Sequence, residues 1–73
     1  MGITTTVGAK LKEIRKLRNL TQAEAAKGYG CTRQYIIMVE NDQINLGIRG
    51  LRKFAKFYGI SVETLTTLKL GKE

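Results

Sequence analysis

The chain has 73 residues, with 13 Lys or Arg against 6 Asp or Glu and a formal net charge of +7. A chain of this length forms one small domain with a modest core, which disfavours a catalytic cleft or a second domain. The excess of cations favours a polyanionic partner, because Lys and Arg contacts to phosphates release condensed counterions. A basic surface that serves solubility alone is the alternative.

The residue types also narrow the function classes. No apolar run approaches the ~20 residues of a membrane span, and the N-terminus lacks a secretory pattern. The single cysteine, Cys31, has no disulfide partner, and without histidine there is no complete zinc site. We therefore expect a cytoplasmic protein that needs no metal or cofactor, with no small-molecule ligand evident. The sequence offers no plausible pair of general base and nucleophile, so we expect no enzymatic activity.

Residues 1–6 are expected to form a flexible arm before the first helix. Val7, Leu11 and Ile14 recur at helical spacing and predict a helix over Val7–Arg18. Asn19 can take the left-handed conformation that ends such a helix.

The segment Thr21–Asn41 predicts two short helices joined by a tight turn. Thr21 is a good N-cap, and Glu24 stands at the capping-box position three residues later. Gly30 can take the positive φ that ends the first helix. Gly28 falls inside that helix, where it costs ~1 kcal/mol relative to Ala and gives a reason for the helix to be shorter.

Thr32 is expected to cap the second helix of this segment. Ile36, Val39 and Glu40 share one face of that helix by their spacing, which predicts that this face packs inward. The opposite face carries Arg33, Gln34, Ile37 and Met38. Two short helices around a glycine turn form a helix-turn-helix pattern, whose second helix is built to lie in a DNA major groove.

The C-terminal part predicts two further helices after a polar connector over Asp42–Gly47. Gly59 is expected to end the first of them and Ser61 to cap the second. The apolar positions expected to face the core are Ile48, Leu51, Phe54, Ala55 and Tyr58, followed by Val62, Leu65 and Leu68. We therefore predict an all-α fold, a compact bundle of about five short helices in one domain over residues 7–70, followed by a tail over residues 71–73.

IRKLRNLTQAEAAKGYGCTRQYIIMVEN, followed after a connector by LRKFAKFYGISVETL, resembles the Xre family of DNA-binding domains. These are the small all-helical modules of phage repressors, Cro proteins and the controller proteins of restriction–modification systems. The resemblance covers Val7 to about Leu68, and TRQYIIMVEN followed by NLGI is similar to the controller proteins in particular. It implies a lambda-repressor-like domain that binds double-stranded DNA.

The resemblance also implies roles for individual residues. Gln22 would contact a phosphate at the start of the first motif helix, and Asn41 would do so at the end of the second. Thr32 would open the recognition helix and help to fix its register on the duplex. Arg15 and Glu40 match a pair that forms a buried salt bridge in many members of the family.

By the same resemblance, Arg33 and Gln34 would reach base edges. A guanidinium offers two parallel donors that match O6 and N7 of guanine, and a glutamine amide can pair with N6 and N7 of adenine. The alternative for both is a solvated side chain. Tyr35 would hold the DNA backbone or only pack its ring. Ile37 and Met38 would contact thymine methyl groups or form an apolar patch for another protein chain.

The sequence departs from the family pattern at several positions. Asp42 stands where the family usually has a glycine, and Asp tolerates the left-handed region at some cost. Leu46 replaces a common proline, and Ile37 and Met38 occupy positions that are usually polar. These departures weaken any transfer of base specificity.

The function that we predict is sequence-specific binding of double-stranded DNA by a transcriptional regulator, in the form of a repressor. One domain contacts one half-site, so we expect a homodimer on half-sites ~34 Å apart. Leu65, Leu68 and Leu70 are the candidate dimer residues. The alternative is a protein-interaction module, such as an antitoxin with the same fold. Steep loss of duplex affinity with rising salt would favour the first.

Overall fold

A computed structural model describes residues 6–66 of the chain, apart from the side chain of Thr66. Its helices are α1 (Val7–Leu17), α2 (Gln22–Tyr29), α3 (Arg33–Glu40), α4 (Ile48–Tyr58) and α5 (Val62–Thr66). The predicted all-α fold of five short helices is confirmed, and the described part of the chain contains no strand. None of these helices is long and apolar enough to cross a membrane.

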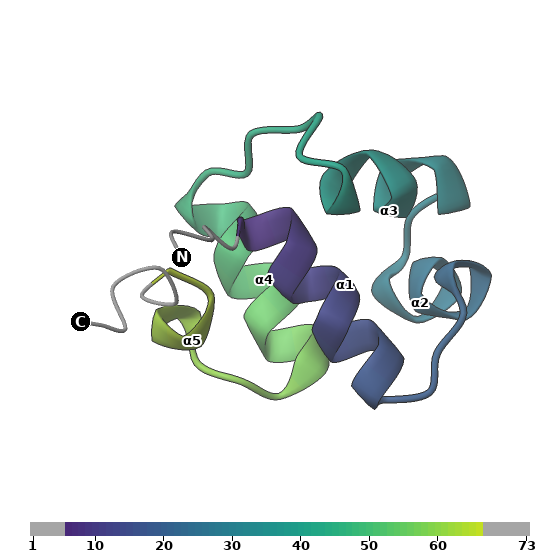
Figure 1. The fold of residues 1–73 in the computed structure, drawn as a ribbon, viewed down its shortest axis with the longest axis horizontal. Helices are drawn as coiled ribbons and strands as arrows, with labels where there is room; N and C mark the ends of the chain where they lie inside the picture. Colours follow the sequence, from purple (N-terminus) through teal and green to yellow (C-terminus); the bar gives the residue numbers. More distant parts are fainter. Residues whose placement is uncertain (1–5, 67–73) are drawn as a thin grey trace, which may run out of the picture.

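Figure 1 shows α2 and α3 together at one end of the molecule and α5 at the other. Helices α1 and α4 lie between these ends, and α3 runs along an outer edge. Several predictions fall outside the described residues. They concern most of the predicted arm, the whole tail, and the dimer candidates Leu68 and Leu70.

The helix-turn-helix segment is delimited by the caps that its sequence predicts. Thr21 Oγ1 accepts a hydrogen bond from Glu24 N at 3.0 Å, and Glu24 Oε1 accepts one from Thr21 N at 2.8 Å. At the other end of α2, Gly30 has φ 92°. Thr32 Oγ1 accepts from Tyr35 N at 3.1 Å and caps α3. Two orphan N–H groups at the start of α2 and one at the start of α3 are thus satisfied locally.

Asp42 connects the end of α3 to the start of α1. Asn19 after α1 and Asp42 after α3 are left-handed, each with φ 59°. The Asp42 carboxylate accepts hydrogen bonds from Gly8 N at 3.0 Å and from Thr6 Oγ1 at 2.5 Å. A carboxylate at a helix N-terminus is also favoured by the helix dipole. These contacts offset the cost of the left-handed conformation at a non-glycine residue.

Gly8 allows α1 and α3 to approach closely. A Cβ atom at this position would lie 2.4 Å from the carbonyl oxygen of Val39 and 2.8 Å from that of Glu40. Real side chains do not tolerate such distances, and backbone oxygens cannot move aside as a flexible side chain can. The glycine therefore sets how near the N-terminus of α1 comes to the C-terminal turn of α3.

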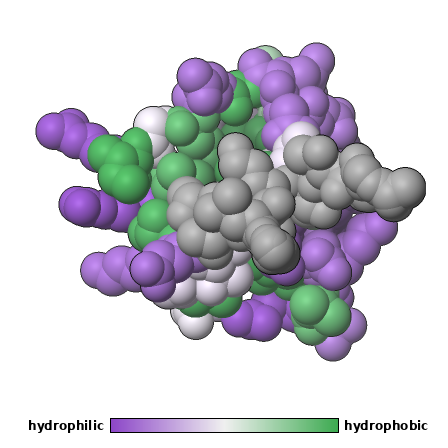
Figure 2. All heavy atoms as spheres, turned by 60° about the vertical axis from the view of Figure 1, so that its left-hand side comes forward, coloured by the Kyte–Doolittle hydropathy of each residue, from purple (hydrophilic) through white to green (hydrophobic). Residues whose placement is uncertain are grey.

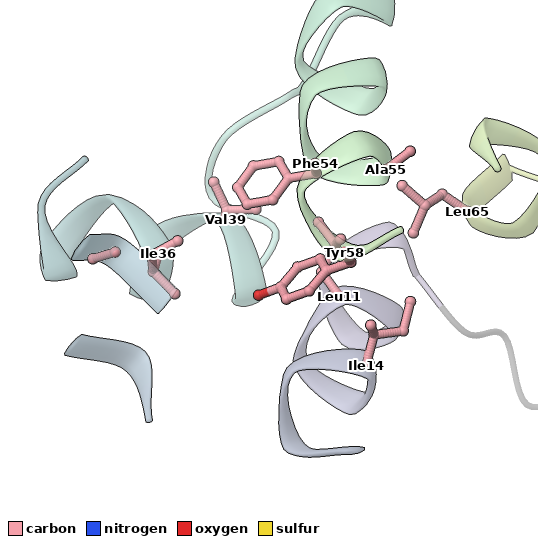
Figure 3. Close-up of a cluster of buried hydrophobic side chains, with 9 residues drawn as sticks. Leu11, Ile14, Ile36, Val39, Phe54, Ala55, Tyr58 and Leu65 are labelled. Carbon is pink, nitrogen blue, oxygen red and sulfur yellow. The ribbon is translucent and has the colours of Figure 1, made fainter. Parts of the chain in front are cut away.

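The core is built from most of the apolar positions that helical spacing predicts. The expectation that Ile48 faces the core is wrong, because its side chain is 54% exposed at the start of α4. Figure 3 shows the main members of the core, which come from α1, α3, α4 and α5. Its largest fully buried side chains are Phe54, Leu11, Ile36 and Leu65. Ala26 adds a small buried side chain from α2. Each helix thus contributes to one cluster, as expected for a bundle of short helices around a single core.

The expectation that Gly28 shortens the first motif helix is wrong, because α2 continues through Gly28 to Tyr29. A Cβ atom at Gly28 would lie 2.9 Å from Cε1 of Phe57. The glycine makes room for this aromatic ring of α4, and the tertiary contact outweighs the low helix propensity.

Candidate nucleic-acid interface

Helix α3 has one buried face and one open face. Ile36 and Val39 are buried in the core, while Arg33 and Gln34 are exposed. Thr32, the capping residue, is exposed as well. The packing therefore turns the first residues of α3 away from the protein, as a helix that reads a major groove requires.

Arg33 and Gln34 have free side chains at the start of this helix. Within residues 6–66, neither side chain forms a hydrogen bond or an ion pair. Arg33 is also the first residue of α3, where the helix dipole disfavours a cation. This placement gains the side chain no hydrogen bond or ion pair within the described residues, and its donors remain available to an acceptor outside the protein.

Tyr35 packs against the protein. Its ring lies nearly parallel to that of Tyr29, with 6.4 Å between the centroids and 20° between the planes. The side chain is half-buried. The structure thus shows the ring-packing role, and contact of the hydroxyl with DNA stays a prediction.

Ile37 and Met38 are half-buried and retain some exposed surface on α3. This partial exposure is compatible with contact to thymine methyl groups and with contact to a protein. Both alternatives therefore stay predictions.

Gln22 and Asn41 lie at the two ends of the helix-turn-helix. Gln22 is the first residue of α2, half-buried, and its Nε2 donates to Glu40 Oε1 at 3.3 Å. Asn41 is the exposed C-cap of α3, and its backbone N–H donates to the carbonyl oxygen of Ile37 at 3.0 Å. Phosphate contacts by these residues stay predictions, and the bond from Gln22 to Glu40 is a feature that the sequence did not indicate.

Arg15 and Glu40 meet in a buried ion pair. Arg15 Nε lies 2.7 Å from Glu40 Oε2, and the two side chains are 7% and 3% exposed. A second hydrogen bond joins Arg15 Nη2 to Glu40 Oε1 at 3.2 Å, and Arg15 Nη1 donates to the Leu20 carbonyl oxygen at 2.7 Å. Hydrogen bonding to Glu40 raises the pKa of Arg15 despite the opposing effect of burial. The pair fixes the end of α3 to α1.

Leu65 is not available as a dimer residue, because its side chain is 0% exposed and belongs to the core cluster. The surplus of leucines near the C-terminus suggested an interface, but the core of this small domain uses Leu65 itself. Leu68 and Leu70 are not described by the structure.

Helix α4 carries a row of cations to which the sequence pattern assigns no role. Arg49, Arg52, Lys53 and Lys56 are all exposed. Lys53 Nζ lies 4.6 Å from the centroid of the Tyr29 ring, so the row borders the C-terminal end of α2. The spacing of the cations is visible in the sequence, but the side of the molecule that they occupy depends on how α4 packs.

The chain is also similar in sequence to known proteins. Residues 11–65 match the helix-turn-helix family. The chain is 41% identical over 56 residues to a Methanocaldococcus jannaschii protein named as an HTH-type transcriptional regulator, covering 77% of this chain and 85% of that protein.

Two longer proteins are also similar. The chain is 37% identical over 60 residues to the immunity repressor protein of Bacillus phage phi105, covering 82% of this chain and 42% of the repressor. It is 38% identical over 55 residues to the HTH-type transcriptional regulator PuuR of Escherichia coli, covering 75% of this chain and 30% of PuuR. The chain thus spans most of the first relative but less than half of either longer one.

Proposed function

The chain belongs to the helix-turn-helix family and is a DNA-binding transcriptional regulator, and we propose that it reads a specific duplex sequence by placing α3 in the major groove. The observation that carries this proposal is the open start of α3. Arg33 and Gln34 are exposed and have no partner within the described residues, although they lie on an otherwise well-packed helix.

The base contacts that we propose follow from the chemistry of these two side chains. Arg33 pairs with O6 and N7 of a guanine, and Gln34 pairs with an adenine or serves as a weaker polar contact. Ile37 and Met38 lie further along α3 and contact the methyl groups of thymines that flank the bases contacted by Arg33 and Gln34. A recognition helix uses its N-terminal residues in this way while the rest of the motif crosses the backbone.

The backbone contacts that we propose surround α3. Gln22 at the start of α2 and Asn41 at the end of α3 donate hydrogen bonds to phosphates, which fix the register without selecting a sequence. The cationic row of α4, whose Lys53 lies over Tyr29, adds an electrostatic contribution that depends on salt. The net charge of +7 supports such a contribution.

We propose that the active form is a homodimer on a two-fold site and that it acts as a repressor. One domain covers one half-site, and half-sites one helical turn apart require a second copy. Figure 2 shows hydrophobic residues gathered at the surface on the α5 end, and Ile48 at the start of α4 is 54% exposed. Repression is supported by the similarity to a phage immunity repressor.

The protein-interaction alternative is not favoured, because the relatives reported above are named as transcriptional regulators or as a repressor. The same names indicate regulation of transcription, which supports our expectation that the chain has no enzymatic activity. Such a protein acts where the DNA lies, in keeping with the cytoplasmic location that we predict.

Selection of bound sequences from a pool of random duplexes tests the proposed function. We expect a two-fold symmetric consensus, with affinity for the selected site that falls steeply as salt rises. A pool that shows no enrichment after repeated rounds, together with no shift of any duplex at low salt, would refute the proposal.

A further inference from the structure

The buried carboxylate of Glu40 binds two side chains, and only one of them is its ion-pair partner. Both of its oxygens accept hydrogen bonds from Arg15, at 2.7 and 3.2 Å. Oε1 also accepts a hydrogen bond from Nε2 of Gln22 at 3.3 Å. One carboxylate thus joins α1, α2 and α3 where α2 begins and α3 ends.

This arrangement determines which way the Gln22 amide faces. An ionised carboxylate only accepts hydrogen bonds, so the nitrogen of the amide, and not its oxygen, must point toward Glu40. The carboxylate itself is held by Arg15, whose Nη1 donates to the Leu20 carbonyl oxygen at 2.7 Å. Because Glu40 is 6% exposed, little water competes for its Oε1.

The oriented amide lies at the N-terminus of α2, where the helix dipole favours an anion. The amide nitrogen carries two hydrogens, and Glu40 uses one of them. The second hydrogen remains for an acceptor outside the protein, such as a phosphate oxygen. A side chain held in its binding orientation loses less conformational entropy when it binds.

We propose that Glu40 is a positioning residue for DNA binding, which holds the Gln22 amide so that its second N–H meets a backbone phosphate. The inference rests on the proposed function, since it assigns a partner to Gln22 on DNA. The bond from Gln22 to Glu40 couples the buried ion pair to the protein surface that faces DNA. Glu40 therefore affects the affinity for DNA through Gln22. A phosphate contact affects all sequences alike, so this effect is the same on the selected site and on a random duplex.

A double-mutant cycle tests this coupling. Arg15→Met/Glu40→Met removes the acceptor for Gln22 without changing the net charge or leaving a charge buried. Binding is measured for the wild type, Gln22→Ala, the Met pair and the combination of all three changes. We expect Gln22→Ala and the Met pair each to weaken binding about tenfold, as for one hydrogen bond to a charged group. The combination is expected to stay within about twofold of either.

Gln34→Ala is the matched control, since this glutamine is exposed and forms no hydrogen bond within residues 6–66. Its effect is expected to multiply with that of the Met pair. If the effect of Gln22→Ala multiplies as well, to a total of about a hundredfold, Glu40 does not act through Gln22 and the inference is wrong. If the wild type binds no duplex, the proposed function fails instead, so that the two failures are distinct.

Side-chain amide exchange in the free wild-type protein decides the orientation even if the Met pair does not fold. We expect the Gln22 NH₂ protons to exchange with water more slowly than those of Gln34, because one of them is bonded to Glu40. Equal exchange rates for the two glutamines would overturn the inference.

Discussion

The Arg15–Glu40 pair makes a sharp prediction about stability. Arg15→Met leaves the Glu40 carboxylate buried with only Gln22 as a partner, since both of its oxygens otherwise accept from Arg15. Removing one member of a buried ion pair costs ~3–5 kcal/mol, because the other charge stays desolvated and uncompensated. A 73-residue domain has a free energy of unfolding of roughly 4–11 kcal/mol. The single variant should therefore lose a large share of this free energy, and at the lower end of the range it would be unfolded at room temperature.

Replacing both members should be far less damaging. Arg15→Met/Glu40→Met removes both charges and fills the space with apolar side chains of similar volume, which is often neutral or stabilising. The exposed pair of Lys10 and Glu13 is the internal control. Its charges are 3.7 Å apart on side chains that are 29% and 60% exposed. Glu13→Ala should therefore change the free energy of unfolding by less than ~1 kcal/mol.

Urea unfolding followed by far-UV circular dichroism measures these differences. The expected order of stability places the wild type and the Met pair close together and Arg15→Met well below both. A loss of less than ~1 kcal/mol in Arg15→Met would refute the claim that the pair is desolvated. A Met pair as unstable as the single variant would show that the ion pair itself, and not the avoidance of an unpaired charge, stabilises the fold.

Two further predictions concern the backbone and the tyrosines. Gly8→Ala should lower the midpoint of thermal unfolding markedly, because its Cβ would lie 2.4 Å from the Val39 carbonyl oxygen. Gly47→Ala is the control and should have a much smaller effect, since its Cβ would meet nothing within 4 Å. Similar midpoints for the two variants would contradict this packing. Burial raises the pKa of Tyr29 and Tyr58 from 10.0 to about 12. As pH rises, the tyrosines of the unfolded chain lose their protons before those of the folded chain. The contribution of the two tyrosines to stability is therefore retained below about pH 10 and is lost as pH rises toward 12. Urea titrations below about pH 10 and near pH 12 measure the loss of unfolding free energy in the wild type, which should be smaller in Tyr58→Phe. Equal losses in the two proteins would show that Tyr58 does not cause the effect.

Local chemistry made the helix boundaries predictable. The capping box of Thr21 and Glu24, the left-handed Asn19 and the positive φ of Gly30 all depend on residues within a few positions of one another. Helical periodicity likewise identified Phe54 and other core positions, because one face of each short helix has to be buried.

Features that depend on packing between distant residues were not predictable. Thr6 and Asp42 are 36 positions apart, and nothing in either local sequence indicates that they bond. The same holds for Gly28 against Phe57, and for the choice of Leu65 as a core residue over a dimer residue. The resemblance to a family supplied the Arg15–Glu40 pair, which spacing alone does not indicate.

The most direct test of the central claim, that the open face of α3 reads DNA bases, is the affinity of Arg33→Ala for the selected site and for a random duplex. We predict a loss of ~1–3 kcal/mol on the selected site, a flattened preference at one base pair, and little change on the random duplex. Arg49→Ala serves as the control and should weaken both duplexes alike. Equal losses on the two duplexes for Arg33→Ala would contradict the account, because they would show that Arg33 contacts only the backbone.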